Sequence, residues 1–256
     1  MNPTKLITSV LTITEFELRK TFHDPSQIFI RAIQPLLWLL VFGEVMAKVR
    51  VLPDTSYSYL QFLTPGVLAQ SVIFMAIFFG INLVWERDRG LLHKLLSTPV
   101  PRHSIIIGKA FSAGVRSIFQ AVLIFILAII IRVQLDLNPV NILGVLLIIV
   151  LTGMCFSSLS ICLASLFRTR ERMMGIGQAI TMPLFFASSA IYPVDLMPNW
   201  LKVLSRVNPL TYVVDALRAL LLTGDFSRLP VDVGVVALSV VIIVGLATLA
   251  FRRIID

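Results

Sequence analysis

The sequence predicts an all-α integral membrane protein with six transmembrane helices. Of its 256 residues 57% are hydrophobic and only 14% are charged, whereas soluble domains spend about 25% on charge. The few charges are concentrated between long apolar stretches, as expected for a chain that crosses a membrane repeatedly. We expect residues 1–256 to form a single transmembrane domain.

Each predicted span is an apolar stretch of about the length that a membrane requires. A helix needs roughly 20 apolar residues to cross about 30 Å of hydrocarbon. The third, fourth and sixth spans contain almost no charge, the first contains Arg31, Gln34, Pro35 and Glu44, and the fifth is short. In order, the spans are 28–47, 62–84, 110–131, 141–166, 174–191 and 232–251.

Lysine and arginine are unevenly distributed over the connections. The N-terminal segment through Arg31 holds four, the 85–109 connection five, the 167–173 connection three and the C-terminal tail two. The alternate connections hold two, one and four, the last spread over the long segment 192–231. Because cytoplasmic loops are enriched in these residues, both termini are predicted to be cytoplasmic. The same bias accounts for the net charge of +8 without a nucleic-acid partner.

Residues 5–23 are predicted to form an amphipathic helix on the cytoplasmic membrane surface. A solvated leader is the alternative. The charges that follow the short apolar stretch 6–13 argue against a cleaved signal peptide. The residues that follow the helical rhythm are Leu6, Val10, Ile13, Glu17 and Lys20.

The connection between the second and third spans contains a short amphipathic helix, predicted over 86–97 and ended by Pro99 and Pro101. Gly90 is unfavourable in a helix by about 1 kcal/mol, so it could instead mark a turn between two shorter pieces. Such a helix can dock in a groove of another protein or lie on lipid headgroups, and the pattern leaves both open. Its apolar stripe consists of Leu91, Leu92, Leu95 and Leu96.

Residues 192–224 are predicted to form a re-entrant hairpin on the external side. After the fifth span, 199–207 can form one short helix, and Asn208 with Pro209 starts a second that ends at Gly224. Both are too short to cross a bilayer, so we expect them to be sheltered by the spans. Asp215 and Arg218 lie three apart and can form an ion pair.

Five residues are candidates for a substrate pathway. Gln34 and Glu44 project in similar directions from the first span, where polar groups usually face the protein interior, although Glu44 could simply reach interfacial water. Gln70 lies in the second span, and Phe185 and Phe186 could provide apolar walls for an amphipathic compound.

The chain carries no recognisable energy source, catalytic group or metal site. Gly108 and Lys109 are followed by Ala110 and lack the preceding glycine of a phosphate-binding loop, where His103 stands. Cys155 and Cys162 suggest only packing. Because the middle of spans two to six lacks acidic residues, a transporter powered by a separate ATPase is favoured. An ion-coupled transporter or channel is the alternative, and a membrane scaffold or sensor is a third hypothesis.

Three motifs make the chain resemble the membrane subunits of type-2 ABC exporters, especially the drug-resistance and lipo-oligosaccharide branches. They are FLTPG at 62–66, ERDRGLLHKLLSTP at 86–99, and 191–222 with YP, MPNW and NPLTYVVDALR. The hairpin residues in or beside the last motif are Tyr192, Pro193, Pro198, Asn208, Pro209, Asp215 and Arg218.

The resemblance implies a permease that pairs with a second copy of itself or a homologous permease and with two cytoplasmic ATP-binding subunits. ATP and Mg would bind those partners, and this chain would carry no cofactor. It implies export of an amphipathic drug, lipid or lipid-linked sugar across a bacterial or archaeal plasma membrane. One departure is Leu91–His93, where the family often has threonine and glutamate. The implied ATPase-coupling residues are Glu86, Arg87, Arg89, Gly90, Leu91, Leu92, Leu95, Leu96 and Pro99.

Overall fold

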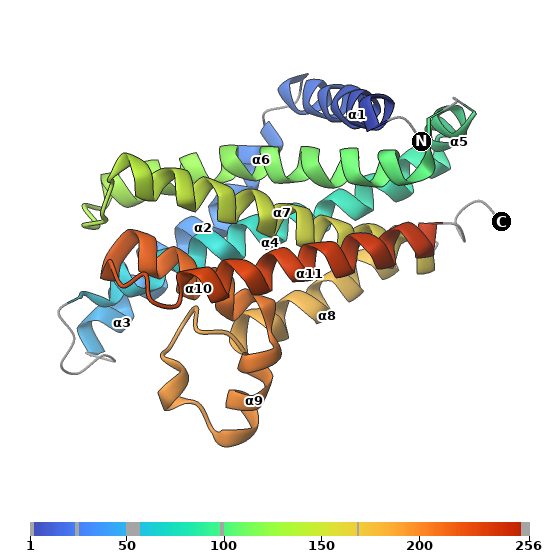
Figure 1. The fold of residues 1–256 in the computed structure, drawn as a ribbon. Helices are drawn as coiled ribbons and strands as arrows, with labels where there is room; N and C mark the ends of the chain where they lie inside the picture. Colours follow the sequence, from blue (N-terminus) through green and yellow to red (C-terminus); the bar gives the residue numbers. More distant parts are fainter. Residues whose placement is uncertain (1–2, 24–25, 50–56, 98–99, 168, 252–256) are drawn as a thin grey trace.

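Four long apolar helices form the body of the molecule. The computed structural model describes residues 3–23, 26–49, 57–97, 100–167 and 169–251, and every regular element in these ranges is a helix. Four are long and apolar enough to cross a membrane. The central one, α7, packs against the other three (Figure 1). These helices are α4 (Tyr59–Asp88), α6 (Arg102–Ile130), α7 (Pro139–Leu166) and α11 (Leu229–Ala250).

Small residues bring the long helices close together. A Cβ atom on Gly80 of α4 would lie 2.5 Å from the backbone oxygen of Ser160 on α7. The Ser160 hydroxyl accepts the Gly80 N–H at 3.1 Å and donates to the Ile77 carbonyl at 2.5 Å. On the α6–α7 contact, a Cβ on Gly153 would lie 2.8 Å from the Cα of Gly114. Such close backbone approach favours helix association in a membrane.

The first and fifth predicted spans are helical but less regular. The first is a continuous run of α2 (Ser26–Leu37), the π-helix η1 (Trp38–Gly43) and α3 (Glu44–Val49). Pro35 contributes no N–H to this run, and π-helical segments accommodate such interruptions. The fifth is α8 (Arg170–Phe186), which has 17 residues and ends at a buried turn. The count of six spans therefore stays a prediction.

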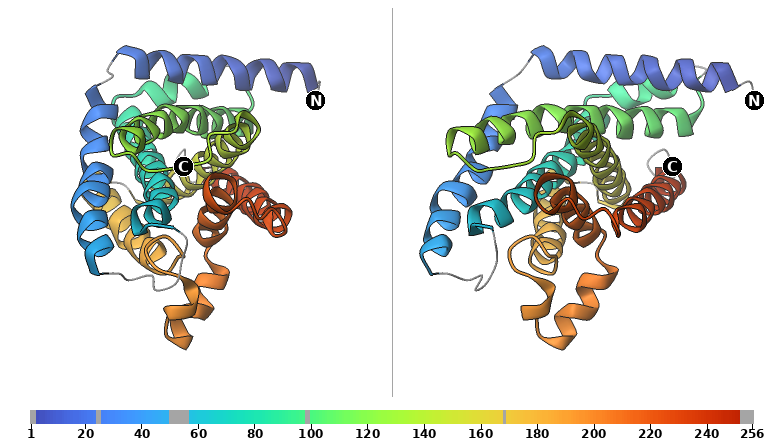
Figure 2. Two further views of the ribbon diagram at one scale, coloured as in Figure 1. Left: turned by 90° about the vertical axis from the view of Figure 1, so that its left-hand side faces the viewer. Right: turned by 60° about the vertical axis from the view of Figure 1, so that its left-hand side comes forward.

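Helix α1 (Pro3–His23) crosses the long helices transversely and packs on α6, as Figure 2 shows. The predicted helix over 5–23 is thus present. Its inner face buries Ile13, Thr14 and Glu17, and the Thr14 hydroxyl donates to the Gly108 carbonyl at 3.2 Å. Its outer face exposes a second set of apolar side chains: Ile7, Leu11 and Phe16.

The segment 86–97 is not one helix, which corrects the prediction. Helix α4 continues to Asp88, a turn follows, and α5 covers only Leu91–Leu96. Gly90 has a φ of +73°, a conformation that glycine adopts readily and other residues rarely do. The alternative prediction of a turn at Gly90 is therefore confirmed.

The hairpin segment, residues 192–224, follows its local sequence signals closely. Asn208 caps α10 by accepting the Leu210 N–H, Pro209 occupies the first helical position, and Gly224 ends the segment with a φ of +64°. Helix α9 projects away from the long helices (Figures 1 and 2). The elements are η2 (Val194–Leu196), α9 (Asn199–Val207), α10 (Pro209–Arg218) and the π-helix η3 (Ala219–Thr223).

Candidate functional site

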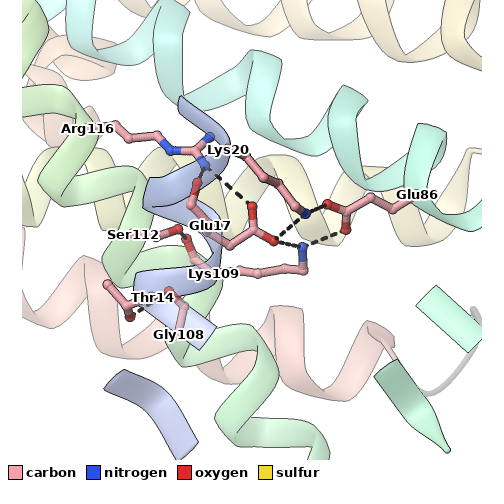
Figure 3. A network of polar contacts seen from close by, with 8 residues as sticks. All are labelled: Thr14, Glu17, Lys20, Glu86, Gly108, Lys109, Ser112 and Arg116. Carbon is pink, nitrogen blue, oxygen red and sulfur yellow. Dashed lines mark hydrogen bonds and ion pairs between the residues drawn. The ribbon is translucent and has the colours of Figure 1, made fainter. Parts of the chain in front are cut away.

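A buried group of charges lies where α1, α4 and α6 meet, and we call it the charge network. At its centre, the Lys109 Nζ donates to the Glu17 carboxylate at 2.5 Å and to the Glu86 carboxylate at 2.6 Å (Figure 3). Lys20 contacts the same two carboxylates, at 3.3 Å and 2.7 Å respectively. The members are Glu17, Lys20, Glu86, Lys109 and Arg116.

Arg116 is the fifth member of the network and contacts Glu17 and Phe79. Its guanidinium donates to the backbone carbonyl of Glu17, lies 3.4 Å from the Glu17 carboxylate and stacks 5.1 Å from the Phe79 ring. The side chains of Lys109 and Glu17 are only 3% and 4% exposed. Burial alone would raise the pKa of Glu17, but Lys109, Lys20 and Arg116 together outweigh it and leave that pKa below its ordinary value. Glu17 is therefore buried and still carries its negative charge at neutral pH.

Each element contributes to the network from a defined position. Glu17 and Lys20 come from the inner face of α1, Glu86 from the last turn of α4, and Lys109 and Arg116 from one face of α6. The last turn of α4 is followed directly by the Gly90 turn and α5. The network therefore joins the base of the predicted coupling segment to the N-terminal helix.

Sequence reasoning identified Glu86 but missed the rest of this network. Its contacts join residues 92 and 99 positions apart, which periodicity within one segment cannot detect. One signal was available, because Lys109 and Arg116 lie seven residues apart on one face of an otherwise apolar helix. Buried cations need carboxylate partners, so two such residues indicate acidic groups on a neighbouring element.

The other predicted coupling residues lie around the Gly90 turn. Leu92 is 2% exposed and belongs to an apolar cluster with residues of α4, α6, α7, α8 and α11, whereas Leu91 is 45% exposed. The predicted leucine stripe is therefore divided between the protein interior and the surface. Arg89 stacks on Trp85 at 4.9 Å. Arg87 lies 3.6 Å from the Asp88 carboxylate, and Leu95 is partly buried. Pro99 and the side chain of Leu96 lie outside the described residues.

The pathway candidates lie in two different settings. Gln34 lines an open groove of about 570 Å³ along α2 and η1, and Glu44 is exposed at the start of α3. Phe185 is buried with its ring 5.5 Å from Trp38 in that groove wall, and Phe186 is 45% exposed. Gln70 is instead buried on α4, where its amide has no hydrogen-bond partner among the described residues. The other groove residues are Leu37, Trp38, Val41, Phe42 and Val45.

The hairpin segment supplies side chains to the buried turn 187–192, where α8 ends. Backbone carbonyls freed at a helix end need donors when they are buried. The Asn208 amide donates to the carbonyls of Leu184 at 2.6 Å and Ala187 at 3.2 Å. The hydroxyls of Tyr59 and Tyr192 donate to Ile191 at 2.9 Å and Phe186 at 2.5 Å. Of the remaining predicted residues, Pro193 and Pro198 directly precede η2 and α9.

The predicted ion pair of Asp215 and Arg218 is present, at 3.3 Å. Arg218 also donates to the Ser189 carbonyl at 2.8 Å and lies 3.9 Å above the Phe62 ring. The Asp215 carboxylate accepts the Ser189 hydroxyl at 2.6 Å. Through Ser189 and Phe62, the pair therefore connects the buried turn with the start of α4.

Long apolar helices, internal charge pairing and sheltered irregular backbone define a membrane-embedded helical protein. The family model described as "ABC-2 type transporter" matches residues 8–222. The chain belongs to the ABC-2 type transporter family, and its role is that of a transport permease, in a family whose members work with an ATP-binding subunit.

The curated relatives carry transport names. The chain is 31% identical to the transport permease ycf38 of Cyanophora paradoxa over 199 residues, 77% of this chain and 68% of the relative. It is 25% identical to the daunorubicin resistance ABC transporter permease DrrB1 of Streptomyces coeruleorubidus, over 78% of this chain and 70% of that one. It is 26% identical to the inner membrane transport permease YadH of Escherichia coli K12, over 78% of each.

Proposed function

We propose that this chain is the permease subunit of an ABC exporter that moves an amphipathic drug, lipid or lipid-linked sugar outward, powered by a separate ATPase. The observation that carries the proposal is α5, which is anchored by buried Leu92 and presents Leu91 and Lys94 at the surface. A short helix with one anchored and one exposed face suits docking in a groove of another protein. Two ATP-binding subunits and a second permease would complete the transporter.

The proposed arrangement has six spans and places both termini in the cytoplasm. The run α2–η1–α3 and helix α8 would supply the two spans beyond the four longest helices. The hairpin segment would then lie on the external side, with its irregular turn sheltered by Asn208 and Arg218. The membrane would be the bacterial or archaeal plasma membrane, a location supported by the name of the inner membrane permease YadH.

The apolar groove along α2 and η1 supports an amphipathic substrate. Gln34 is the amide among otherwise apolar and aromatic lining residues, a pattern suited to a ligand with a large apolar part. The name of DrrB1, which refers to daunorubicin resistance, agrees with a drug-like compound as one candidate.

A surface substitution on α5 tests the proposed docking. Leu91→Asp should abolish co-purification with the ATP-binding subunit and ATP-driven export, because it places a carboxylate in an apolar contact. The side chain is exposed, so the permease itself should remain folded. The matched control is Leu196→Asp, which changes another exposed leucine, in the hairpin segment, and should leave association intact.

Two results would contradict the proposal. Unchanged co-purification of Leu91→Asp with the ATPase would remove α5 from the docking surface. Transport by the wild-type chain that survives ATP depletion but stops when the ion gradient is collapsed would favour the ion-coupled alternative.

A further inference from the structure

The charge network is an unusual way to hold α1 against the long helices. A buried ion pair contributes little net stability, because the desolvation of its charges offsets their attraction, and apolar side chains of similar size often serve as well. The inner face of α1 already carries apolar Ile13, which packs on Gly108 of α6. Attachment alone therefore does not account for five charged residues in one place.

The contacts of Lys109 suggest that the network links the movement of two helices. Its ammonium group is shared between a carboxylate on α1 and a carboxylate on the last turn of α4, at 2.5 Å and 2.6 Å. Lys20 of α1 makes a second direct link to Glu86, at 2.7 Å. Glu86 therefore cannot move far without pulling α1 along or leaving a buried charge without its partner.

The link between α1 and α4 connects two further elements, α5 after α4 and α2 after α1. On one side, Glu86 is four residues before Gly90, and α5 begins at the next residue. On the other side, α1 ends at His23 and α2, the start of the grooved helical run, begins at Ser26. The charge network thus stands between the surface helix α5 and the groove-bearing first helical run.

We propose that Lys109 and Glu17 are positioning residues that transmit displacement of the ATPase-docking segment through α1 to the groove on α2 and η1. This inference rests on the proposed function, since it takes α5 as the ATPase contact. The directional contacts hold α1 and the end of α4 together as one body during the ATP cycle. Neither residue is assigned a contact with the transported compound.

A charge-balanced double substitution separates transmission from folding. Glu17→Gln with Lys109→Met removes one negative and one positive charge and with them the buried link between α1 and α6. The 2.7 Å pair of Lys20 and Glu86 stays in place, but it is the weaker link because the Lys20 side chain is 38% exposed. The double variant should assemble with the ATPase and unfold near the wild-type temperature. In proteoliposomes containing the whole transporter, we expect transport per ATP hydrolysed to fall by about tenfold.

The same helix provides a matched control. Glu15 and Arg19 form a 2.6 Å pair with exposed side chains, so Glu15→Gln with Arg19→Met makes the corresponding change of charge away from Lys109. Transport per ATP should stay at the wild-type value. If the network double variant assembles and keeps the wild-type ratio, the inference is wrong. If the wild-type chain fails to associate with the ATPase, the proposed function itself fails.

A distance measurement decides the question even if the double variant does not fold. Spin labels replace exposed Thr12 on α1 and Asn82 on α4, in a chain whose two native cysteines have been changed to alanine. The distance between the labels should be the same before and after the assembled transporter binds a non-hydrolysable ATP analogue. A change in that distance would show that α1 and the end of α4 move independently and would overturn the proposal.

Discussion

Glu17 is a carboxylate with almost no access to water, and its charge depends on the three cations around it. Lys109 and Lys20 reach it from different helices, and Arg116 also holds its backbone carbonyl. Removing one partner of such a buried group leaves the others uncompensated, which costs more than the intact group contributes. The surroundings of this one residue therefore contribute to how the stability of the protein responds to acid.

Acidification should weaken the attachment of α1 through Glu17. Because the pKa of Glu17 is lowered on folding, its contribution to stability is complete above its ordinary value of 4.5 and is lost as pH falls through the lowered value. Thermal unfolding in detergent between about pH 7 and about pH 3 measures this loss. Glu17→Gln should destabilise the protein by roughly 3 kcal/mol at neutral pH and should reduce the dependence on pH.

Glu15→Gln is the control for that experiment, because Glu15 is exposed and pairs with Arg19 on the surface of α1. It should change the free energy of unfolding by at most about 0.5 kcal/mol. The role assigned to Glu17 would be wrong if Glu17→Gln and the wild type lost stability in parallel as the pH falls.

At the scale of elements, capping residues, prolines and glycines in the sequence predicted the helix ends at which they lie. Asn208, Pro209 and Gly224 define the start of α10 and the end of η3, and each acts through its own backbone or side chain. Hydropathy was less informative for α4, because it marks the apolar part of a helix and not its ends. The capping box of Ser58 and Gln61 marks the true start, and Gly90 follows the true end.

Contacts between elements lay beyond local signals. Apart from the pair of Lys20 and Glu17, the contacts of the charge network join residues more than 20 positions apart, as do the contacts of Asn208 and Arg218 with the turn 187–192 and the end of α8. Single residue types gave no sign of which helices would meet. Gly80 and Gly153 could be recognised as small residues, but their partners on the neighbouring helices depend on the packing of the whole bundle.

The close contact at Gly80 can be tested by adding one methyl group. Gly80→Ala should destabilise the protein by about 1–3 kcal/mol, because the new Cβ would press on the backbone of Ser160. Gly245→Ala on α11 is the matched control, since nothing lies within 4 Å of its Cβ position. That change should be neutral or stabilising by up to about 1 kcal/mol. Equal unfolding temperatures for the two variants would contradict the packing described.

At the scale of the whole molecule, the arrangement of spans decides where the hairpin segment lies. Four spans formed by α4, α6, α7 and α11 alone would put α5 and the hairpin segment on the same side of the membrane. Six spans, with α2–η1–α3 and α8 included, would put them on opposite sides. The bias of lysine and arginine favours the second arrangement.

Cysteine labelling in intact cells distinguishes these arrangements. In a chain without native cysteines, Phe226→Cys should react with a membrane-impermeant reagent added outside, whereas Lys94→Cys should react only after the membrane is opened. Both positions are exposed. Leu137→Cys is the control, because it lies opposite Lys94 in either arrangement. Protection of Phe226→Cys in intact cells in which Leu137→Cys reacts would rule out six spans.

The buried turn 187–192 also has a consequence for synthesis at the ribosome. Its carbonyls and those at the end of α8 are capped partly by Asn208 and Arg218, which emerge from the ribosome about 20 to 30 residues later. Until then these carbonyls can be satisfied only by water or by the insertion machinery, because hydrocarbon offers no donor. In the proposed six-span arrangement, helix α8 and the hairpin segment would therefore enter the bilayer as one unit, and the hairpin would be required for membrane insertion as well as for the finished fold.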